Sequence, residues 1–140
     1  MNKDNLIILF PDAGAFKWGM KLLDKLNWTG DVCVASKCRQ YSDGKTKLIQ
    51  VIERADFGGK DVLVIDDLLV GGGTFLGLAT MLHERNVGKL FLAVSHITIP
   101  NPNKALETAY ERIYCTNSKY DQYELSNLTV FNMDDLKIFE

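Results

Sequence analysis

The sequence predicts an α/β domain whose central sheet is mostly parallel. Apolar runs of strand length occur at residues 6–10 and 61–65, and they are continuous rather than alternating, which is typical of strands covered on both faces. Between such runs, apolar residues recur every three or four positions, as they do along a helix with one buried side. Strands separated by helices pair in parallel through right-handed crossovers, so this alternation predicts the sheet.

The first strand and the first helix are expected near the N-terminus. The apolar run of residues 6–10 ends at Pro11 and forms the strand. After a turn at residues 12–14, apolar residues at helical spacing form one buried stripe: Phe16, Met20, Leu23 and Leu26. Asp12 precedes this stripe and fits the role of the helix N-cap.

Residues 32–54 are predicted to form two strands of the sheet with a loop between them. Residues 32–35 form a short apolar strand. Residues 37–47 are polar and basic and contain an Asp-Gly turn signal, so we expect a mobile loop. Residues 47–54 alternate and indicate an edge strand ahead of the buried strand at 61–65.

The second half of the chain repeats the alternation of helix and strand. Helical periodicity returns over residues 74–84 through Phe75, Leu78 and Leu82. The remaining expected elements are a strand at 90–95, one or two helical turns at 105–110, and late strands at 113–115 and 128–131.

The composition indicates one domain spanning residues 1–140. Of these residues 46% are hydrophobic and 24% are charged, which is the profile of a globular domain with its own core. A formal net charge of -2 provides no broad electropositive surface, so no nucleic-acid partner is expected. The sequence has no apolar run of the roughly twenty residues that span a bilayer and no signal-peptide pattern, so we expect a cytoplasmic protein without a membrane partner. Cys33, Cys38 and Cys115 lack the paired spacing of a zinc or redox site and are expected to be reduced.

One segment carries most of the functional signal. A buried strand leads to two carboxylates, then to glycines, then to a hydroxyl at the start of a helix: Asp66, Asp67, Gly71, Gly72, Gly73 and Thr74. Consecutive glycines let backbone N–H groups turn toward a phosphate, and the helix N-terminus adds partial positive charge. Ionised carboxylates only accept hydrogen bonds, so they suit a vicinal diol. A phosphorylated ribose presents both groups.

Other interpretations of this segment fit less well. The Walker loop requires a lysine after its last glycine, and none follows Gly73. The dinucleotide fingerprint places its acid about twenty residues after the glycines, whereas Asp66 and Asp67 precede them. A purely structural role, with solvated acids at the end of a strand and a glycine turn, remains the alternative, although a turn does not need three glycines beside two acids.

The segment resembles the ribose-phosphate binding motif of type I phosphoribosyltransferases and ribose-phosphate pyrophosphokinases. The resemblance implies a three-layer, type I phosphoribosyltransferase-like fold with a mostly parallel central sheet and helices on both faces. It assigns the ribose hydroxyls to Asp66 and Asp67, and the 5-phosphate to the turn from Gly71 to Thr74. The chain departs from the motif at Val70 and Gly71, where most members carry an acid and a threonine. A third carboxylate and one hydroxyl contact to the phosphate are therefore missing.

Two further segments resemble ribose-phosphate pyrophosphokinases. The residues after the first strand resemble their pyrophosphate loop, which implies substrate binding by Asp12, Ala13, Gly14 and Ala15. The usual arginine after this loop is replaced by Trp18. Lys37-Cys38-Arg39 resembles the start of their flexible catalytic loop, so Lys37 and Arg39 would stabilise transition-state charge. The alternatives are an ordinary helix cap at Asp12 and a solvated basic loop.

A divalent cation is expected at this site. Three acids, Asp12, Asp66 and Asp67, would repel a polyphosphate. Mg²⁺ held by Asp12 and Asp67 would bridge carboxylate and phosphate oxygens and remove this conflict.

The leading hypothesis is the transfer of diphosphate from ATP to C1 of ribose 5-phosphate, which makes phosphoribosyl diphosphate. Enzymes of this kind have a similar N-terminal domain that supplies part of the ATP site, so we expect either a homo-oligomer or pairing with such a domain. The second hypothesis is a small type I phosphoribosyltransferase that consumes phosphoribosyl diphosphate. The third is a module that binds this ligand without chemistry, which the loss of the acid at Val70 favours.

Overall fold

The structure, a computed structural model, describes residues 3–42 and 44–135, and it gives only the backbone for residues 3, 38–42 and 45–48. In chain order the elements are η1 (Lys3–Asn5), β1 (Leu6–Phe10), α1 (Ala13–Lys25), β2 (Val32–Ser42), β3 (Lys45–Ile52), β4 (Asp61–Leu69), α2 (Gly73–His83), β5 (Leu90–Ile97), α3 (Leu106–Ala109), β6 (Arg112–Thr116), β7 (Leu128–Phe131) and η2 (Met133–Asp135). None of the described helices is long and apolar enough to cross a membrane.

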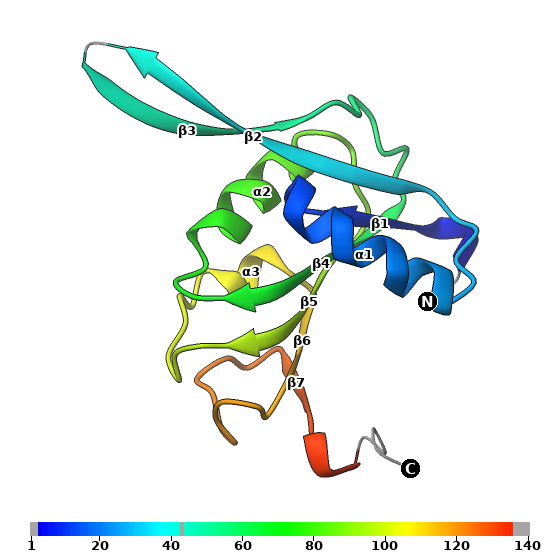
Figure 1. Ribbon diagram of the computed structural model, residues 1–140, viewed down its shortest axis with the longest axis vertical. Coiled ribbons are helices and arrows are strands. Elements are labelled where there is room, and N and C mark those ends of the chain that lie inside the picture. Colours follow the sequence, from blue (N-terminus) through cyan, green and yellow to red (C-terminus); the bar gives the residue numbers. More distant parts are fainter. Residues whose placement is uncertain (1–2, 43, 136–140) are drawn as a thin grey trace.

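One seven-stranded sheet runs through the described residues in the order β3-β2-β1-β4-β5-β6-β7 (Figure 1). β1 pairs in parallel with β2 and β4, and parallel pairing continues through β5 and β6 to β7. β2 and β3 pair antiparallel. The predicted α/β fold with a mostly parallel sheet is therefore confirmed.

Helices cover both faces of the sheet, which gives three layers. The side chains of β1 alternate between the two faces, as the pleat of a strand requires. Phe10 clusters with Leu23 of α1, whereas the adjacent Leu9 clusters with Leu78 of α2. The cluster on the α2 face also includes Leu106 of α3. The expected three-layer arrangement is therefore present.

The stretch expected as a mobile loop forms an antiparallel ribbon instead. β2 pairs with β1 as far as Val34, and from Ala35 onward it pairs with β3. We call this ribbon, residues 35–42 with 45–52, the arm, and it projects away from the body of the domain (Figure 1). Antiparallel pairing satisfies backbone N–H and C=O groups whatever the side chains are, so the polar side chains of this stretch did not exclude a strand. The edge strand predicted at residues 47–54 is confirmed as β3.

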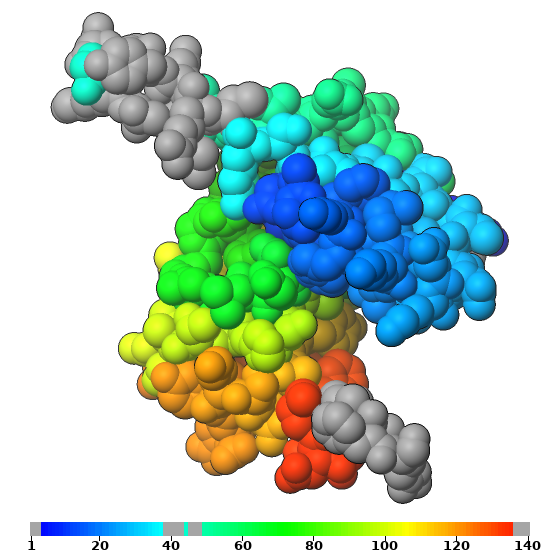
Figure 2. All heavy atoms as spheres, viewed as in Figure 1, coloured from blue at the N-terminus to red at the C-terminus, as the bar shows by residue number. Residues whose placement is uncertain are grey.

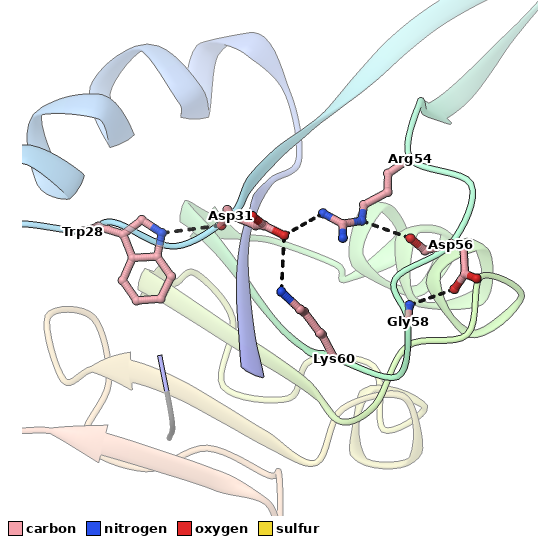
Figure 3. A network of polar contacts seen from close by, with 6 residues as sticks. All are labelled: Trp28, Asp31, Arg54, Asp56, Gly58 and Lys60. Atoms are coloured by element: carbon pink, nitrogen blue, oxygen red, sulfur yellow. Dashed lines mark hydrogen bonds and ion pairs between the residues drawn. The ribbon is translucent and has the colours of Figure 1, made fainter. Parts of the chain in front are cut away.

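A polar network joins the connections that precede β2 and β4 (Figure 3). Oδ2 of Asp31 accepts hydrogen bonds from Arg54 at 3.0 Å and from Lys60 at 3.5 Å. The Arg54 hydrogen bond and the nearby Lys60 charge hold the pKa of Asp31 below its usual value. Arg54 also donates to the backbone oxygen of Asp56 and lies 5.3 Å from the ring centre of Phe57. These groups lie at the amino ends of the strands, so we assign them to the fold rather than to the predicted site.

Gly19 marks a tight contact between α1 and the sheet. A Cβ at this position would lie 2.1 Å from Cε1 of Phe10, whose side chain is fully buried. We predict that Gly19→Ala lowers the free energy of unfolding by about 1–3 kcal/mol, because overpacking exceeds the gain in helix propensity. Urea unfolding followed by circular dichroism measures this loss.

Gly77→Ala in α2 is the matched control for this prediction. A Cβ at Gly77 would meet Oε1 of Gln50 at 2.9 Å, and that atom is the far end of a flexible side chain. Alanine gains about 1 kcal/mol of helix propensity over glycine, so this variant should equal or exceed the wild type in stability. Equal losses in the two variants would contradict the packing explanation.

Candidate functional site

Two junctions between a strand and a helix lie side by side at the carboxyl edge of the sheet. β1 and β4 are parallel neighbours, with Leu9 opposite Val64. Each strand therefore leads to its helix, α1 or α2, from the same edge. Asp12 precedes α1, and Asp66 lies two residues beyond Val64. Burial is the main cause that raises the pKa of Asp66, and the charge of Asp12 adds to it, so the two carboxylates lie within electrostatic reach.

Asp12 caps α1 and also holds a lysine of the arm. Its extended backbone, with φ −162° and ψ 175°, places Oδ1 2.9 Å from the backbone N–H of Ala15. Oδ2 accepts a hydrogen bond from Nζ of Lys37 at 3.0 Å. The Ala15 hydrogen bond, with a smaller contribution from Lys37, holds the pKa of Asp12 below its usual value. Ala13 and Gly14 are exposed in the first turn, so this end of the helix is open to solvent.

The two predicted catalytic cations lie on β2 rather than in a loop after it. Lys37 is opposite Gln50 in the arm and reaches Asp12, so its ammonium group lies at the carboxyl edge. The backbone of Arg39 pairs with that of Leu48. The side chain of Arg39 lies outside the described residues, and its role stays a prediction.

β4 continues through both acids of the predicted ribose segment. It ends at Leu69, beyond the predicted limit of residue 65, because the residues from Asp66 onward keep pairing with β5. Oδ1 of Asp66 accepts the backbone N–H of Asp67 at 2.8 Å. Asp66 is half-buried, whereas Asp67 is exposed. Burial, strengthened by the adjacent Asp67, raises the pKa of Asp66 to about 6. At neutral pH this carboxylate is therefore ionised but poorly solvated, and a ligand hydroxyl that donates to it would stabilise its charge.

The three glycines of the turn have different surroundings. The fold requires glycine at position 72, because φ is 88° and a Cβ would lie 2.9 Å from Cδ1 of Leu106. A Cβ at Gly71 or Gly73 would meet nothing within 4 Å. Gly72 is the N-cap of α2, so no side chain caps this helix, and its first turn contains no acidic residue. The turn therefore combines space for a ligand with the positive end of a helix that also carries Thr74.

Contacts from later elements hold this turn in place. The backbone N–H and the hydroxyl of Thr98 both donate to the backbone oxygen of Leu69, at 3.0 and 3.3 Å. The buried hydroxyl of Tyr110 donates to the backbone oxygen of Phe75, in the first turn of α2, at 2.8 Å. Hydrogen bonds to the backbone oxygens of Leu69 and Phe75 thus fix the chain on both sides of the glycine turn.

A cavity of about 220 Å³ lies beside Asp66. Figure 2 shows a hollow in the surface between α1, in blue, and the last strands, in orange and red. The residues around the cavity include Trp18, Ile65, Asp66 and Ser95, together with the stacked rings of Tyr114 and Phe131. No sequence motif indicated this cavity, because its walls come from α1 and from four strands that are far apart along the chain.

The expected Mg²⁺ has a sparse set of protein ligands. No group of three or more His, Cys, Asp or Glu side chains that could hold a metal ion occurs within residues 3–42 and 44–135, apart from side chains that the structure does not describe. Asp12 and Asp67 each offer a carboxylate on this part of the molecule. Mg²⁺ commonly binds through one or two carboxylates and completes its shell with water and substrate phosphates. The donors present therefore fit a cation that arrives with a phosphate-bearing ligand.

Ionisation of the half-buried Asp66 is expected to lower the free energy of unfolding. Its folded pKa of about 6 exceeds the usual 3.8, so ionisation favours the unfolded chain as pH rises from about 4 to 6. We predict that Asp66→Asn raises the free energy of unfolding by about 1 kcal/mol at pH 7.5, well below the value for a fully buried charge because solvent screens the group. The gain should shrink as pH falls from 6 toward 4, measured by urea unfolding at several pH values.

Asp67→Asn is the control for that measurement. Asp67 is the adjacent carboxylate on the same strand, but it is exposed and keeps its hydration. Its gain should be smaller, because water solvates this exposed carboxylate in the folded chain. A stability gain at Asp66 that stays constant from pH 4 to 8 would contradict the electrostatic explanation.

A family model and several named proteins match most of this chain. Residues 1–126 match the family model described as phosphoribosyl transferase domain. A protein of Oryza sativa subsp. japonica named ribose-phosphate pyrophosphokinase 4 is 34% identical over 115 residues, which are 82% of this chain and 31% of that protein. The ribose-phosphate pyrophosphokinase of Chlorobaculum tepidum is 24% identical over 136 residues, which are 93% of this chain and 41% of that protein. The chain thus spans less than half the length of these relatives.

Solved structures share the fold. The phosphoribosylpyrophosphate synthetase of Mycobacterium smegmatis matches 95% of this chain and 42% of its own, with a TM-score of 0.68 and 17% identity. A hypoxanthine phosphoribosyltransferase of Staphylococcus aureus matches 93% of this chain and 62% of its own, with a TM-score of 0.53 and 16% identity.

Proposed function

The chain belongs to the phosphoribosyl transferase domain family, and on this premise we propose that it binds ribose 5-phosphate or phosphoribosyl diphosphate at the carboxyl edge between β1 and β4. The observation that carries the proposal is the open space at Gly71 and Gly73, beside two carboxylates and an uncapped helix. Only Gly72 is explained by the fold, so a purely structural turn does not account for the other two glycines.

In this proposal each group of the site binds the part of the ligand that suits it. Asp66 and Asp67 accept hydrogen bonds from the ribose hydroxyls, and the backbone N–H groups from Gly71 to Thr74 bind the 5-phosphate. The first turn of α1 faces the diphosphate end of the ligand, with Ala13 and Gly14 exposed and the backbone of the buried Ala15 behind them. Mg²⁺ held by Asp12 and Asp67 would neutralise that diphosphate.

We further propose that the chain contributes to the transfer of diphosphate from ATP to ribose 5-phosphate. In this reaction the hydroxyl oxygen on C1 of the ribose attacks the β-phosphorus of ATP, and its proton is released to water. The bond between the β-phosphorus and the oxygen that it shares with the α-phosphorus breaks, and AMP leaves. Lys37 and Arg39 would stabilise the negative charge that develops in the transition state. The named ribose-phosphate pyrophosphokinases among the relatives support this activity. Since the chain spans 31% and 41% of those two relatives, we propose that ATP binding requires a second domain or a second subunit.

Val70 favours a second candidate function. Its side chain is 55% exposed at the ribose turn, at a position where the resembling motif carries an acid. A chain without that acid can bind the ribose ligand yet lack a group for proton transfer, so a non-catalytic binding module is the second proposal. A small phosphoribosyltransferase is the third proposal, supported by the matching family model and by the shared fold.

The paired acids provide the direct test of ligand binding. We predict that Asp66→Asn combined with Asp67→Asn weakens the binding of ribose 5-phosphate roughly 100-fold, because two charge-assisted hydrogen bonds are lost. Isothermal titration calorimetry measures the affinity, and circular dichroism checks the fold. The control is Asp134→Asn with Asp135→Asn, another pair of adjacent exposed acids, which lies in η2. Unchanged affinity in the first double variant would refute the assignment of the diol.

The products formed from each set of substrates distinguish the three candidate functions. AMP formed from ATP, ribose 5-phosphate and Mg²⁺ identifies the diphosphate transfer. Release of pyrophosphate from phosphoribosyl diphosphate with a purine or pyrimidine acceptor identifies a phosphoribosyltransferase. Binding of the ribose ligand without either product leaves the binding module.

A further inference from the structure

The two carboxylate oxygens of Asp12 have different partners. Oδ1 accepts the backbone N–H of Ala15 at 2.9 Å, a bond that belongs to the first turn of α1. Oδ2 accepts from the ammonium group of Lys37 at 3.0 Å, and this partner lies 25 residues away in the sequence. The side chains of Lys37 and Asp12 are 29% and 34% exposed, so water and ions can reach the pair. One oxygen of Asp12 is therefore fixed by the fold, and the other is held by an exchangeable partner.

Lys37 lies where the arm leaves the sheet. The last residue of β2 that pairs with β1 is Val34, and Lys37 follows three positions later. Its cross-strand partner is Gln50, whose Oε1 approaches Gly77 of α2 so closely that a Cβ there would lie 2.9 Å away. The base of the arm thus contacts the start of α1 through Lys37 and approaches α2 through Gln50. The Lys37 ammonium group therefore lies at the start of α1, at the point where the arm leaves the sheet.

A divalent cation and Lys37 cannot share Oδ2 of Asp12 without repulsion. Mg²⁺ coordinates a carboxylate oxygen at about 2.0–2.1 Å, whereas the ammonium nitrogen of Lys37 lies 3.0 Å from the same oxygen. Two positive groups on one oxygen would stand within a few ångströms of each other, which is unfavourable in a site partly shielded from water. Oδ1 is the less available oxygen for a cation, because it already accepts the Ala15 N–H that caps α1.

We propose that Lys37 is a built-in counter-ion of Asp12 that a divalent cation displaces. In the unliganded chain the ammonium group neutralises Asp12. When the cation takes Oδ2, the released Lys37 turns to the anionic ligand that accompanies the cation. The exchange at Asp12 thus couples the binding of the cation to the binding of the anion. The identity of that anion rests on the proposed function, whereas the exchange at Asp12 can be tested with the metal alone.

The test measures the binding of Mn²⁺ to the full chain, by electron paramagnetic resonance of the free ion, without any phosphate. Lys37→Met should bind Mn²⁺ about two- to five-fold more tightly than the wild type, because it lacks the competing ion pair. Damage to the fold would lower the affinity, so an increase distinguishes exchange from a structural role. Lys21→Met, which removes an exposed positive charge from α1, is the matched control and should leave the affinity unchanged.

A third variant tests whether Asp12 is the ligand. Asp12→Asn keeps an N-cap side chain that can accept the Ala15 N–H, and it removes the carboxylate charge. In combination with Lys37→Met it should abolish the gain in Mn²⁺ affinity. Equal or weaker binding by Lys37→Met, or a gain that survives Asp12→Asn, overturns the proposal. Calorimetry with ribose 5-phosphate in the absence of metal tests the proposed function separately, because the proposed binding of that ligand depends on Asp66 and Asp67.

Discussion

The parallel pairing of β1 with β4 is the constraint from which the candidate site follows. Because these two strands are neighbours with the same direction, both chain turns that follow them emerge at one edge of the sheet. One turn carries Asp12 and the start of α1, and the other carries the glycine turn and the start of α2. Both strands also contribute buried side chains to both hydrophobic clusters, so neither strand can shift without disturbing two helix layers. The positions of the polar groups are thus determined by an apolar core.

The negative charges of Asp12 and Asp66 are compensated to different degrees by neighbouring groups. Asp12 has a helix N-terminus and Lys37 as compensating partners, and both favour its ionised form. Asp66 accepts a hydrogen bond from the backbone N–H of Asp67, which lowers its pKa. Burial and the neighbouring negative charges raise the pKa by more than this bond lowers it. A group that is poorly compensated in the free protein has more to gain when a ligand donates hydrogen bonds to it. The site therefore keeps an electrostatic cost in the unliganded fold at the position where ligand hydroxyls are proposed to bind.

The apolar pattern was a reliable guide to the fold, and it was weakest where side chains are polar. The strands at residues 6–10 and 128–131 agree with the prediction at both ends, because apolar runs are enclosed between breakers. The part of the arm at residues 37–47 was wrongly expected as a loop, because the pairing of β2 with β3 is sustained by backbone groups rather than by an apolar face. At the site, motif spacing located the acids and the glycines, but no local pattern indicated that Lys37 would reach Asp12 or that Tyr114 and Phe131 would line a cavity beside Asp66. Those contacts depend on sheet order, which brings distant segments together.

The unequal thickness of the two hydrophobic layers has a consequence for local unfolding. The cluster under α1 contains few buried side chains, Phe10 and Leu23 among them, whereas the cluster under α2 and α3 extends across most of the sheet. Regions with less buried apolar surface open at a lower free energy than the domain as a whole. A sub-global opening would therefore detach α1 first and carry Asp12 away from the edge, while the glycine turn stays anchored through Tyr110. Of the two proposed cation ligands, Asp12 is thus built on the layer that opens more easily, whereas Asp67 and the sugar-phosphate turn are built next to the more stable layer.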